Sequence, residues 1–214
     1  MTPHYFDPDP QTGSEPRTVS LVLPDLYLPL RTDRAMFSAD HVDLGTRILL
    51  ETVPPPPRQG TLVDLGCGYG PIALTMASRA PQASVLGVDV NERAVELAGY
   101  NAHQNHLYNV DFKVGSDPML VDDHLDVQAE QAPAHIAALW SNPPIRIGKP
   151  ALHHLLTTWL ARLAPTASAH LVVQRNLGAD TLHRWLETQS YPCTRIASRS
   201  GYRVLRVDAP TSIT

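Results

Sequence analysis

Apolar and polar residues alternate over residues 17–23 and again over residues 26–30, near the start of the chain. A two-residue period places successive side chains on opposite faces of an extended segment, so each stretch is a predicted strand. The pair Pro24-Asp25 between them is a turn signal, and together these features predict a hairpin. A short helix capped by Asp43 follows, and a run of four prolines ends it.

Beyond the prolines, short apolar runs alternate with stretches in which apolar residues recur about every 3.6 positions. The predicted strands cover residues 61–65, 84–88, 110–114, 136–140, 169–173, 194–197 and 202–207, and the predicted helices cover residues 71–80, a segment capped by Asn91, residues 149–163 and residues 179–186. This alternation is typical of an α/β fold with a mostly parallel sheet, helices on both faces and an antiparallel pair at one edge. We therefore divide the chain into an N-terminal extension, residues 1–57, and a seven-stranded α/β domain, residues 58–214.

The composition supports a globular protein with a sizeable core, because 43% of the 214 residues are hydrophobic and only 18% are charged. No apolar run approaches the length of about 18 residues that a membrane helix needs. The two cysteines, Cys67 and Cys193, are too few for a secreted disulfide framework. We therefore expect packed thiols and a cytoplasmic location.

Charge is distributed unevenly along the chain, although the net charge is only -4. Residues 141–214 hold nine Lys or Arg against three Asp or Glu, whereas residues 1–140 hold eight against eighteen. Such asymmetry can mark a face for an anionic partner. Alternatively, the two parts interleave in space and the difference averages out, and the sequence leaves both interpretations open.

A glycine-rich turn between the first domain strand and its helix is the strongest local motif. Gly66, Gly68 and Gly70 allow a tight turn and a close approach of a ligand to the backbone. Their G-x-G-x-G spacing differs from the G-x-G-x-x-G of dinucleotide sites, and Pro71 removes an amide where a pyrophosphate needs donors. The turn therefore favours a sulfonium ligand with an amino-acid tail, whose ammonium group Asp64 helps to hold.

Acidic residues also follow the next two predicted strands. Asp89 ends the second strand, where a carboxylate can accept hydrogen bonds from both hydroxyls of a ribose. Ser116 and Asp117 follow the third strand, and Asp117 is placed to accept a bond from an adenine amino group. Ligands of open α/β sheets bind at the carboxyl ends of strands, so the three positions together predict one nucleoside site.

The fourth domain strand ends in Asn142, Pro143, Pro144 and Ile145. The two prolines fix the backbone, so that the Asn142 side-chain oxygen and the Pro143 carbonyl can accept both hydrogens of a planar amine. These bonds aim the nitrogen lone pair at a methyl donor, which is catalysis by positioning and preorganised electrostatics. A proline turn can also simply end a strand. The catalytic interpretation depends on the position of this turn beside the predicted nucleoside site.

With these motifs in place, the chain resembles the small class I S-adenosylmethionine-dependent methyltransferases, Rossmann-like enzymes related to the ribosomal RNA guanine-N2 methyltransferases. The resemblance covers nearly the whole chain. The stretches that carry it are His4-Tyr5-Phe6, Met36-Phe37-Ser38, Asp43-Leu44-Gly45, Asp64 to Ile72, Asp89 to Ala94, Asn142 to Lys149, Gln174 to Gly178 and Gly201-Tyr202.

The resemblance implies S-adenosylmethionine as cofactor, RNA as substrate, and three groups of site residues. The cofactor contacts are expected at Asp64, Gly66, Cys67, Gly68, Asp89, Val90, Ser116, Asp117 and Asn142, the catalytic turn at Asn142, Pro143, Pro144 and Ile145, and substrate contacts at Phe37, Arg146 and Lys149. Related enzymes often carry an aromatic residue at the position of Ile145 that stacks on the target base. Here stacking is expected from Phe37 or is absent.

The remaining histidines and basic residues add less to the predicted function. The ten histidines include the pairs His103 and His106, and His153 and His154, whose spacings are not those of a zinc site, so no metal is predicted. Five basic side chains are candidates for contact with RNA phosphates or, equally, for ordinary solvated charge. They are Arg146, Lys149, Arg175, Arg199 and Arg203.

Three hypotheses remain for the function. The first is methylation of guanine N2 in ribosomal or other structured RNA. The second keeps the chemistry and changes the target to adenine N6 or a protein glutamine amide, because these nitrogens are also planar and conjugated. The third is a non-catalytic RNA-binding module that retains the cofactor pocket.

Overall fold

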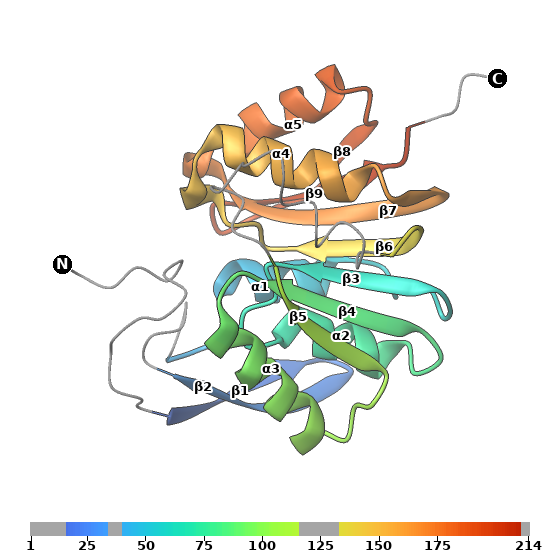
Figure 1. Cartoon of the computed structure of the whole chain (residues 1–214). Helices are drawn as coiled ribbons and strands as arrows, with labels where there is room; N and C mark the ends of the chain where they lie inside the picture. The colour runs from blue at the N-terminus through green and yellow to red at the C-terminus, as the bar shows by residue number, and fades with distance from the viewer. Residues whose placement is uncertain (1–15, 34–39, 116–132, 211–214) are drawn as a thin grey trace.

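The computed structural model describes residues 16–33, 40–115 and 133–210, which form a central sheet with helices on both faces (Figure 1). The seven strands lie in the order β5-β4-β3-β6-β7-β9-β8. The strand bounds are β3 (Thr61–Leu65), β4 (Ser84–Asp89), β5 (Val110–Val114), β6 (Ile136–Ser141), β7 (Leu163–Gln174), β8 (Cys193–Arg199) and β9 (Tyr202–Asp208). β3 to β7 are parallel and β9 is antiparallel to both neighbours, which confirms the predicted sheet.

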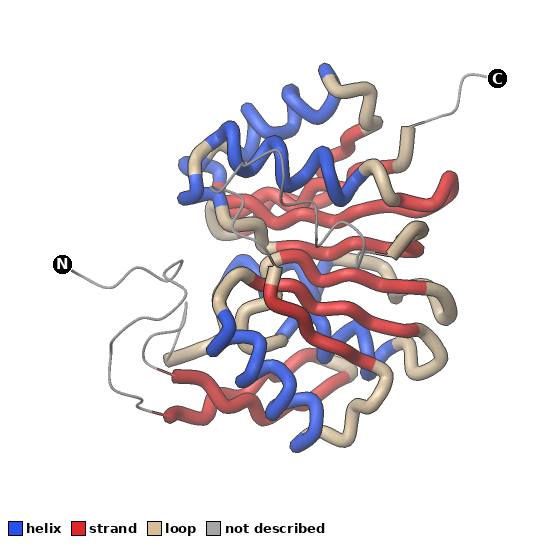
Figure 2. The backbone as a smooth tube through the Cα atoms, viewed as in Figure 1, coloured by secondary structure: helices blue, strands red, loops and turns tan. Residues whose placement is uncertain are grey.

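Different helices cover the two faces of the sheet (Figure 2). Successive residues of β3 serve different faces, because Leu62 joins one hydrophobic cluster and Val63 the other. The Leu62 face is covered by α1 (Leu44–Thr52), α2 (Pro71–Arg79) and α3 (Glu92–Gln104), and the Val63 face by α4 (Lys149–Leu160) and α5 (Ala179–Thr188). None of the helices in the described part of the chain combines the length and apolar character that crossing a bilayer requires.

The predicted hairpin forms as a separate two-stranded sheet, β1 (Pro16–Leu23) with β2 (Leu26–Asp33). Its buried residues, such as Leu21 and Leu30, belong to the same cluster as Leu62 and do not build a core of their own. Asn101 on α3 ties β2 to the glycine turn, since its amide nitrogen donates to the carbonyls of Arg31 and Tyr69 at 2.8 and 2.9 Å. The division into an extension and a domain stays a prediction, and the two parts share one core.

The largest difference from the predicted bounds lies between the end of α4 and the start of β7. The helix expected over residues 149–163 ends at Leu160, and β7 begins at Leu163 instead of residue 169. Pro165 favours this extended path, because proline lacks the amide hydrogen that a helix needs and disfavours helical geometry at Ala164. The chain therefore extends early, and Leu163 pairs with Ile136 at the start of β6.

The strand order reverses between β3 and β6. From β3 the chain moves outward to β4 and β5, and then returns to the other side of β3 as β6. At such a switch point the connections leave a crevice at the carboxyl ends of the two central strands. The glycine turn follows β3 at this edge, and the Asn142 turn follows β6.

Candidate active site

The glycine turn and the Asn142 turn meet at this edge. Gly66 has a φ of 78°, a left-handed conformation that favours glycine. Its amide and that of Cys67 donate to the Val88 carbonyl at 2.8 and 3.0 Å, which fixes the turn to the end of β4. A Cβ on Gly66 would lie 3.7 Å from Pro144 Cδ and 3.8 Å from the Asn142 carbonyl oxygen. The two predicted motifs are therefore brought together from β3 and β6.

Asp64 is fully buried at the end of β3. Its Oδ2 accepts a hydrogen bond from the Ala73 amide at 2.9 Å, which ties α2 to the strand, and its Oδ1 has no partner among the described residues. Burial raises the pKa of this carboxyl to about 8, and the nearby Asp89 charge adds to the effect. Because a buried oxygen without a partner is costly, Asp64 fits a cationic ligand such as the ammonium group of S-adenosylmethionine.

Asp89 is buried and held at both oxygens. Oδ2 accepts from the Gly68 amide at 2.8 Å and Oδ1 from the Asn91 amide at 3.0 Å. Asn91 in turn caps α3 by accepting the Ala94 amide at 3.1 Å. A carboxylate can accept several hydrogen bonds at its two oxygens, so this fixed carboxylate has the chemistry that a ribose diol needs. The neighbouring Val90 is half-buried at the same strand end.

The Cys67 side chain is buried within the glycine turn. Burial raises the pKa of its thiol, and the charges of Asp89 and Asp64 raise it further. Burial also raises the pKa of Cys193 to about 12. Both thiols stay protonated at neutral pH, so neither has the thiolate character of a nucleophile.

The Asn142 turn is held by several hydrogen bonds. Ser141 Oγ donates to the Leu65 carbonyl at 2.5 Å and links the ends of β6 and β3. Pro144 has φ -75° and ψ 71°, the geometry of an inverse γ-turn, and the Ile145 amide donates to the Pro143 carbonyl at 2.8 Å. That carbonyl is thereby fixed and keeps one lone pair for another donor.

The Asn142 side chain itself is half-buried and oriented by α1. Its Nδ2 donates to Asp43 Oδ2 at 2.8 Å and to Thr46 Oγ1 at 3.2 Å. The amide oxygen has no hydrogen-bond partner among the described residues, and is the atom available to a substrate. Ile145 packs against the hydrophobic cluster under α4 and α5 instead of standing free as a stacking surface.

The basic residues divide into two groups. Arg199 pairs with Glu51, and Arg203 bonds to Asp180 at 3.3 Å. In contrast, three exposed cations at the ends of β6 and β7 make no ion pair within the described part of the chain. They are Arg146 on the 3-10 turn η2 (Ile145–Ile147), Lys149 at the start of α4, and Arg175 on η3 (Arg175–Leu177). The predicted site residues Phe37, Ser116 and Asp117 lie outside the described residues.

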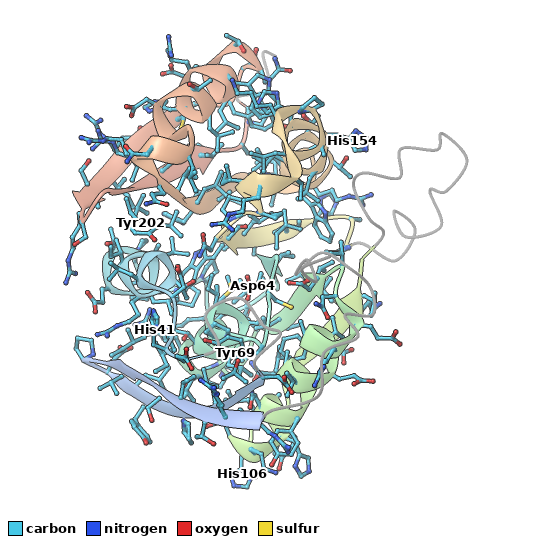
Figure 3. All side chains as sticks on the ribbon, turned by 90° about the vertical axis from the view of Figure 1, so that its left-hand side faces the viewer. His41, Asp64, Tyr69, His106, His154 and Tyr202 are labelled. Carbon is cyan, nitrogen blue, oxygen red and sulfur yellow. The ribbon has the colours of Figure 1, made fainter. Side chains whose placement is uncertain are left out.

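Sequence reasoning did not assign Asp43 and Thr46 to the site. Asp43 was identified only as a helix cap, a role the structure confirms, because its Oδ2 accepts the Thr46 amide at 2.9 Å. Their contacts with Asn142 span 99 and 96 positions of the chain. No local pattern carries that information. In the view of Figure 3, Asp64 lies near the middle of the molecule, between Tyr202 on β9 and Tyr69 in the glycine turn.

The fold and these fixed polar groups define a class I methyltransferase, a Rossmann-like enzyme that uses S-adenosylmethionine. Residues 27–206 match the methyltransferase small domain family, and the chain belongs to this family.

Relatives are found among both sequences and solved structures. The uncharacterized protein YbxB of Bacillus subtilis is 32% identical over 96% of this chain and 98% of its own length. Ribosomal RNA small subunit methyltransferase C of Stutzerimonas stutzeri is 29% identical over 92% of this chain and 56% of its own. A 16S rRNA N2 methyltransferase of T. thermophilus, solved with AdoMet and guanosine, shares the fold with a TM-score of 0.73 at 23% identity, covering 94% of this chain and 52% of that one. The chain thus spans about half the length of the ribosomal RNA methyltransferases it matches.

The raised pKa of Asp64 leads to a prediction about cofactor binding. A free carboxyl with a pKa of about 8 is mostly protonated at pH 7, whereas a bound ammonium group lowers that pKa. Binding at pH 7 should therefore release up to about one proton and tighten as the pH rises toward 8. Calorimetry in two buffers of different ionisation enthalpy measures that release. Asp64→Asn should abolish it and weaken binding about 10- to 100-fold, and release that is unchanged in Asp64→Asn would assign the proton to another group.

Proposed function

We propose that this enzyme methylates the exocyclic N2 of guanine in structured RNA, with ribosomal RNA as the foremost candidate. The observation that carries the proposal is the pair of fixed acceptors on the Asn142 turn, a turn whose Pro144 Cδ and Asn142 backbone carbonyl lie next to Gly66 of the glycine turn. The ribosomal RNA methyltransferases among the relatives support the choice of substrate. We also place the enzyme in the cytoplasm, in keeping with its two free thiols.

The chemistry asked of the protein is modest. When bound, S-adenosylmethionine supplies a methyl group on a positively charged sulfur. The Asn142 side-chain oxygen and the Pro143 carbonyl accept the two hydrogens of the target amine and hold its lone pair in line with that methyl carbon. The same two acceptors would hold the amine while it takes the methyl group, and the methylated nitrogen, briefly cationic, would then lose a proton to solvent. Two neutral acceptors suffice, because that proton is acidic only after transfer.

The three unpaired cations give the proposed RNA a place to bind. Arg146, Lys149 and Arg175 follow the carboxyl ends of the adjacent parallel strands β6 and β7, so they share the edge that holds Asn142. Phosphate contacts of this kind position a nucleic acid without reading its bases. The acidic groups Asp64 and Asp89 lie at the ends of β3 and β4, on the cofactor side of the same edge.

Replacing all three cations by alanine should weaken RNA binding and flatten its salt dependence. Each lost phosphate contact reduces the steepness of log K against log salt by about 0.7–0.9, so the triple variant should lose about 2–3. Binding titrations between low and moderate salt measure the slope. The matched control is Arg58→Ala, which removes an exposed arginine from the segment before β3, at the opposite edge. Equal slopes in the triple variant and wild type would remove these residues from the RNA site.

A second target class has one observation in its favour. The release factor glutamine methyltransferase of Aliivibrio fischeri is 43% identical over 79 residues, which is 36% of this chain. A glutamine amide nitrogen is planar, and the same acceptor pair could hold it.

Methyl-labelled cofactor with RNA, DNA and protein fractions from cells lacking the enzyme separates these targets. We expect label in RNA, recovered as N2-methylguanosine after digestion. Label confined to the protein fraction would replace RNA by a protein target, and label on adenine would change the base.

A further inference from the structure

The hydrogen-bonding partners of the Asn142 amide, and not only their distances, determine which end of the amide faces α1. Asp43 Oδ2 lies 2.8 Å from Asn142 Nδ2, and an ionised carboxylate only accepts hydrogen bonds. The nitrogen end of the amide must therefore face Asp43, while Thr46 Oγ1 accepts from the same nitrogen at 3.2 Å. With both hydrogens directed toward α1, the amide oxygen is turned away from that helix.

We propose that Asp43 and Thr46 are positioning residues for methyl transfer, forming a clamp on the Asn142 amide. The clamp engages the two N–H bonds of the amide and so presents its oxygen to the target nitrogen. This inference rests on the proposed role of Asn142 as an acceptor. It extends that role to two residues on another element of the fold.

The clamp is built on a rigid support. Asp43 Oδ2 also accepts the Thr46 amide, so one oxygen both caps α1 and holds Asn142. The first turn of α1 is packed closely, since a Cβ on Gly45 would lie 2.7 Å from Tyr202 Cε1 and 2.9 Å from Asp43 Oδ2. Tyr202 belongs to β9 and thereby fixes α1 against the sheet. The acceptor is thus preorganised before a substrate arrives.

The charge of Asp43 gives the clamp a second effect. This carboxylate is close enough to two phenols to contribute, after burial, to the raised pKa of Tyr69 and of Tyr202. A charged acceptor on the nitrogen side of the Asn142 amide polarises that group. The polarisation places more negative charge on the amide oxygen. The oxygen becomes a stronger acceptor for the target amine.

Loss of the clamp has a definite chemical consequence. A free amide can rotate and present its nitrogen to the target, where two N–H donors would oppose each other. Only part of the population would then hold the amine correctly. The rate of transfer should fall, while cofactor binding at Asp64 and Asp89 should be unaffected.

Asp43→Ser tests this consequence. Serine is as good a helix cap as aspartate, but its shorter side chain does not reach Asn142. We expect kcat to fall about 10- to 100-fold, with the cofactor Kd within about twofold of wild type. Thr46→Val should lower kcat in the same way, and Thr46→Ser should restore it. Asp43→Asn keeps an oxygen for both partners and should recover most of the activity.

The matched control is Asp25→Ser, which makes the same substitution in the hairpin turn and removes both 2.8 Å bonds that Arg79 donates to this carboxylate. It should leave kcat unchanged even where it lowers the melting temperature. In an Asn142→Ala background, Asp43→Ser should cause no further loss, because the clamp acts through Asn142. Losses that multiply in the double variant, or an unchanged kcat in both Asp43→Ser and Thr46→Val, would overturn the clamp.

The test of the clamp can be distinguished from the test of the proposed RNA target. The ratio of variant to wild-type rate is measured on whichever fraction the wild type labels, so a target other than RNA refutes the RNA proposal and still tests the clamp. The side-chain amide resonances of Asn142 give a readout that needs no substrate. They should shift and exchange faster with solvent in Asp43→Ser but not in Asp25→Ser, and identical resonances in all three proteins would refute the clamp.

Discussion

Asn142→Ala should lower kcat about 100- to 1,000-fold and leave the Kd for S-adenosylmethionine within about twofold of wild type. The side-chain oxygen accepts a hydrogen of the target amine, and that bond aligns the nitrogen with the methyl group. The cofactor groups at Asp64 and Asp89 are held by bonds to Ala73, Gly68 and Asn91, none of which involves Asn142. The effect therefore belongs to transfer rather than to cofactor binding.

Single-turnover rates with labelled cofactor and calorimetric binding of that cofactor measure the two quantities separately. Asn105→Ala is a suitable control, because its amide bonds to the Pro29 and Asn101 carbonyls at the end of α3. It should leave both quantities unchanged. A loss of affinity in Asn142→Ala equal to its loss of turnover would assign the residue to the cofactor instead of the target nitrogen.

Asp89→Ala should raise the Kd for S-adenosylmethionine about 100- to 10,000-fold. Two hydrogen bonds from ribose hydroxyls to a carboxylate contribute about 1.5–3 kcal/mol each. The variant also frees the Gly68 and Asn91 amides, which Asp89 holds at 2.8 and 3.0 Å, so the glycine turn loses part of its support. Asp89→Asn retains an acceptor and should fall between the wild type and alanine.

Calorimetry or fluorescence titration with the cofactor measures this effect. At saturating cofactor, kcat should stay within about tenfold of wild type, since Asp89 does not touch the target nitrogen. Asp111→Ala removes an exposed carboxylate from neighbouring β5 and should change neither quantity. An unchanged Kd in Asp89→Ala would move the ribose site elsewhere and leave Asp89 with a purely structural role.

The local motifs were predictable because each depends on neighbours in the chain. Glycine at positions 66, 68 and 70 was expected to turn the chain, and all three residues have left-handed φ values. Asn91 was expected to cap α3 and does so through its side-chain oxygen. The end of α4 was predicted three residues too late, because Leu163 pairs with Ile136 in the sheet and that pairing has no local signal.

The candidate site was predictable only in part. The sequence placed Asp64, Asp89 and Asn142 at strand ends, and the parallel order of β4, β3 and β6 brings those ends to one edge. It also made no distinction among the five basic residues that were candidates for contact with RNA phosphates, namely Arg146, Lys149, Arg175, Arg199 and Arg203. The structure separates them, since Arg199 and Arg203 are engaged with Glu51 and Asp180.

The sequence alone therefore determined the alternation of strands and helices, the glycine turn and the residue types at the strand ends, because these follow from backbone preferences and short-range periodicity. Only the tertiary structure decided what those residues touch. Among the described residues it placed Asp43 against Asn142, left one oxygen of Asp64 without a partner, and packed Ile145 against the core. Such contacts join positions far apart in the chain, and their geometry is set by the packing of whole elements rather than by any local pattern.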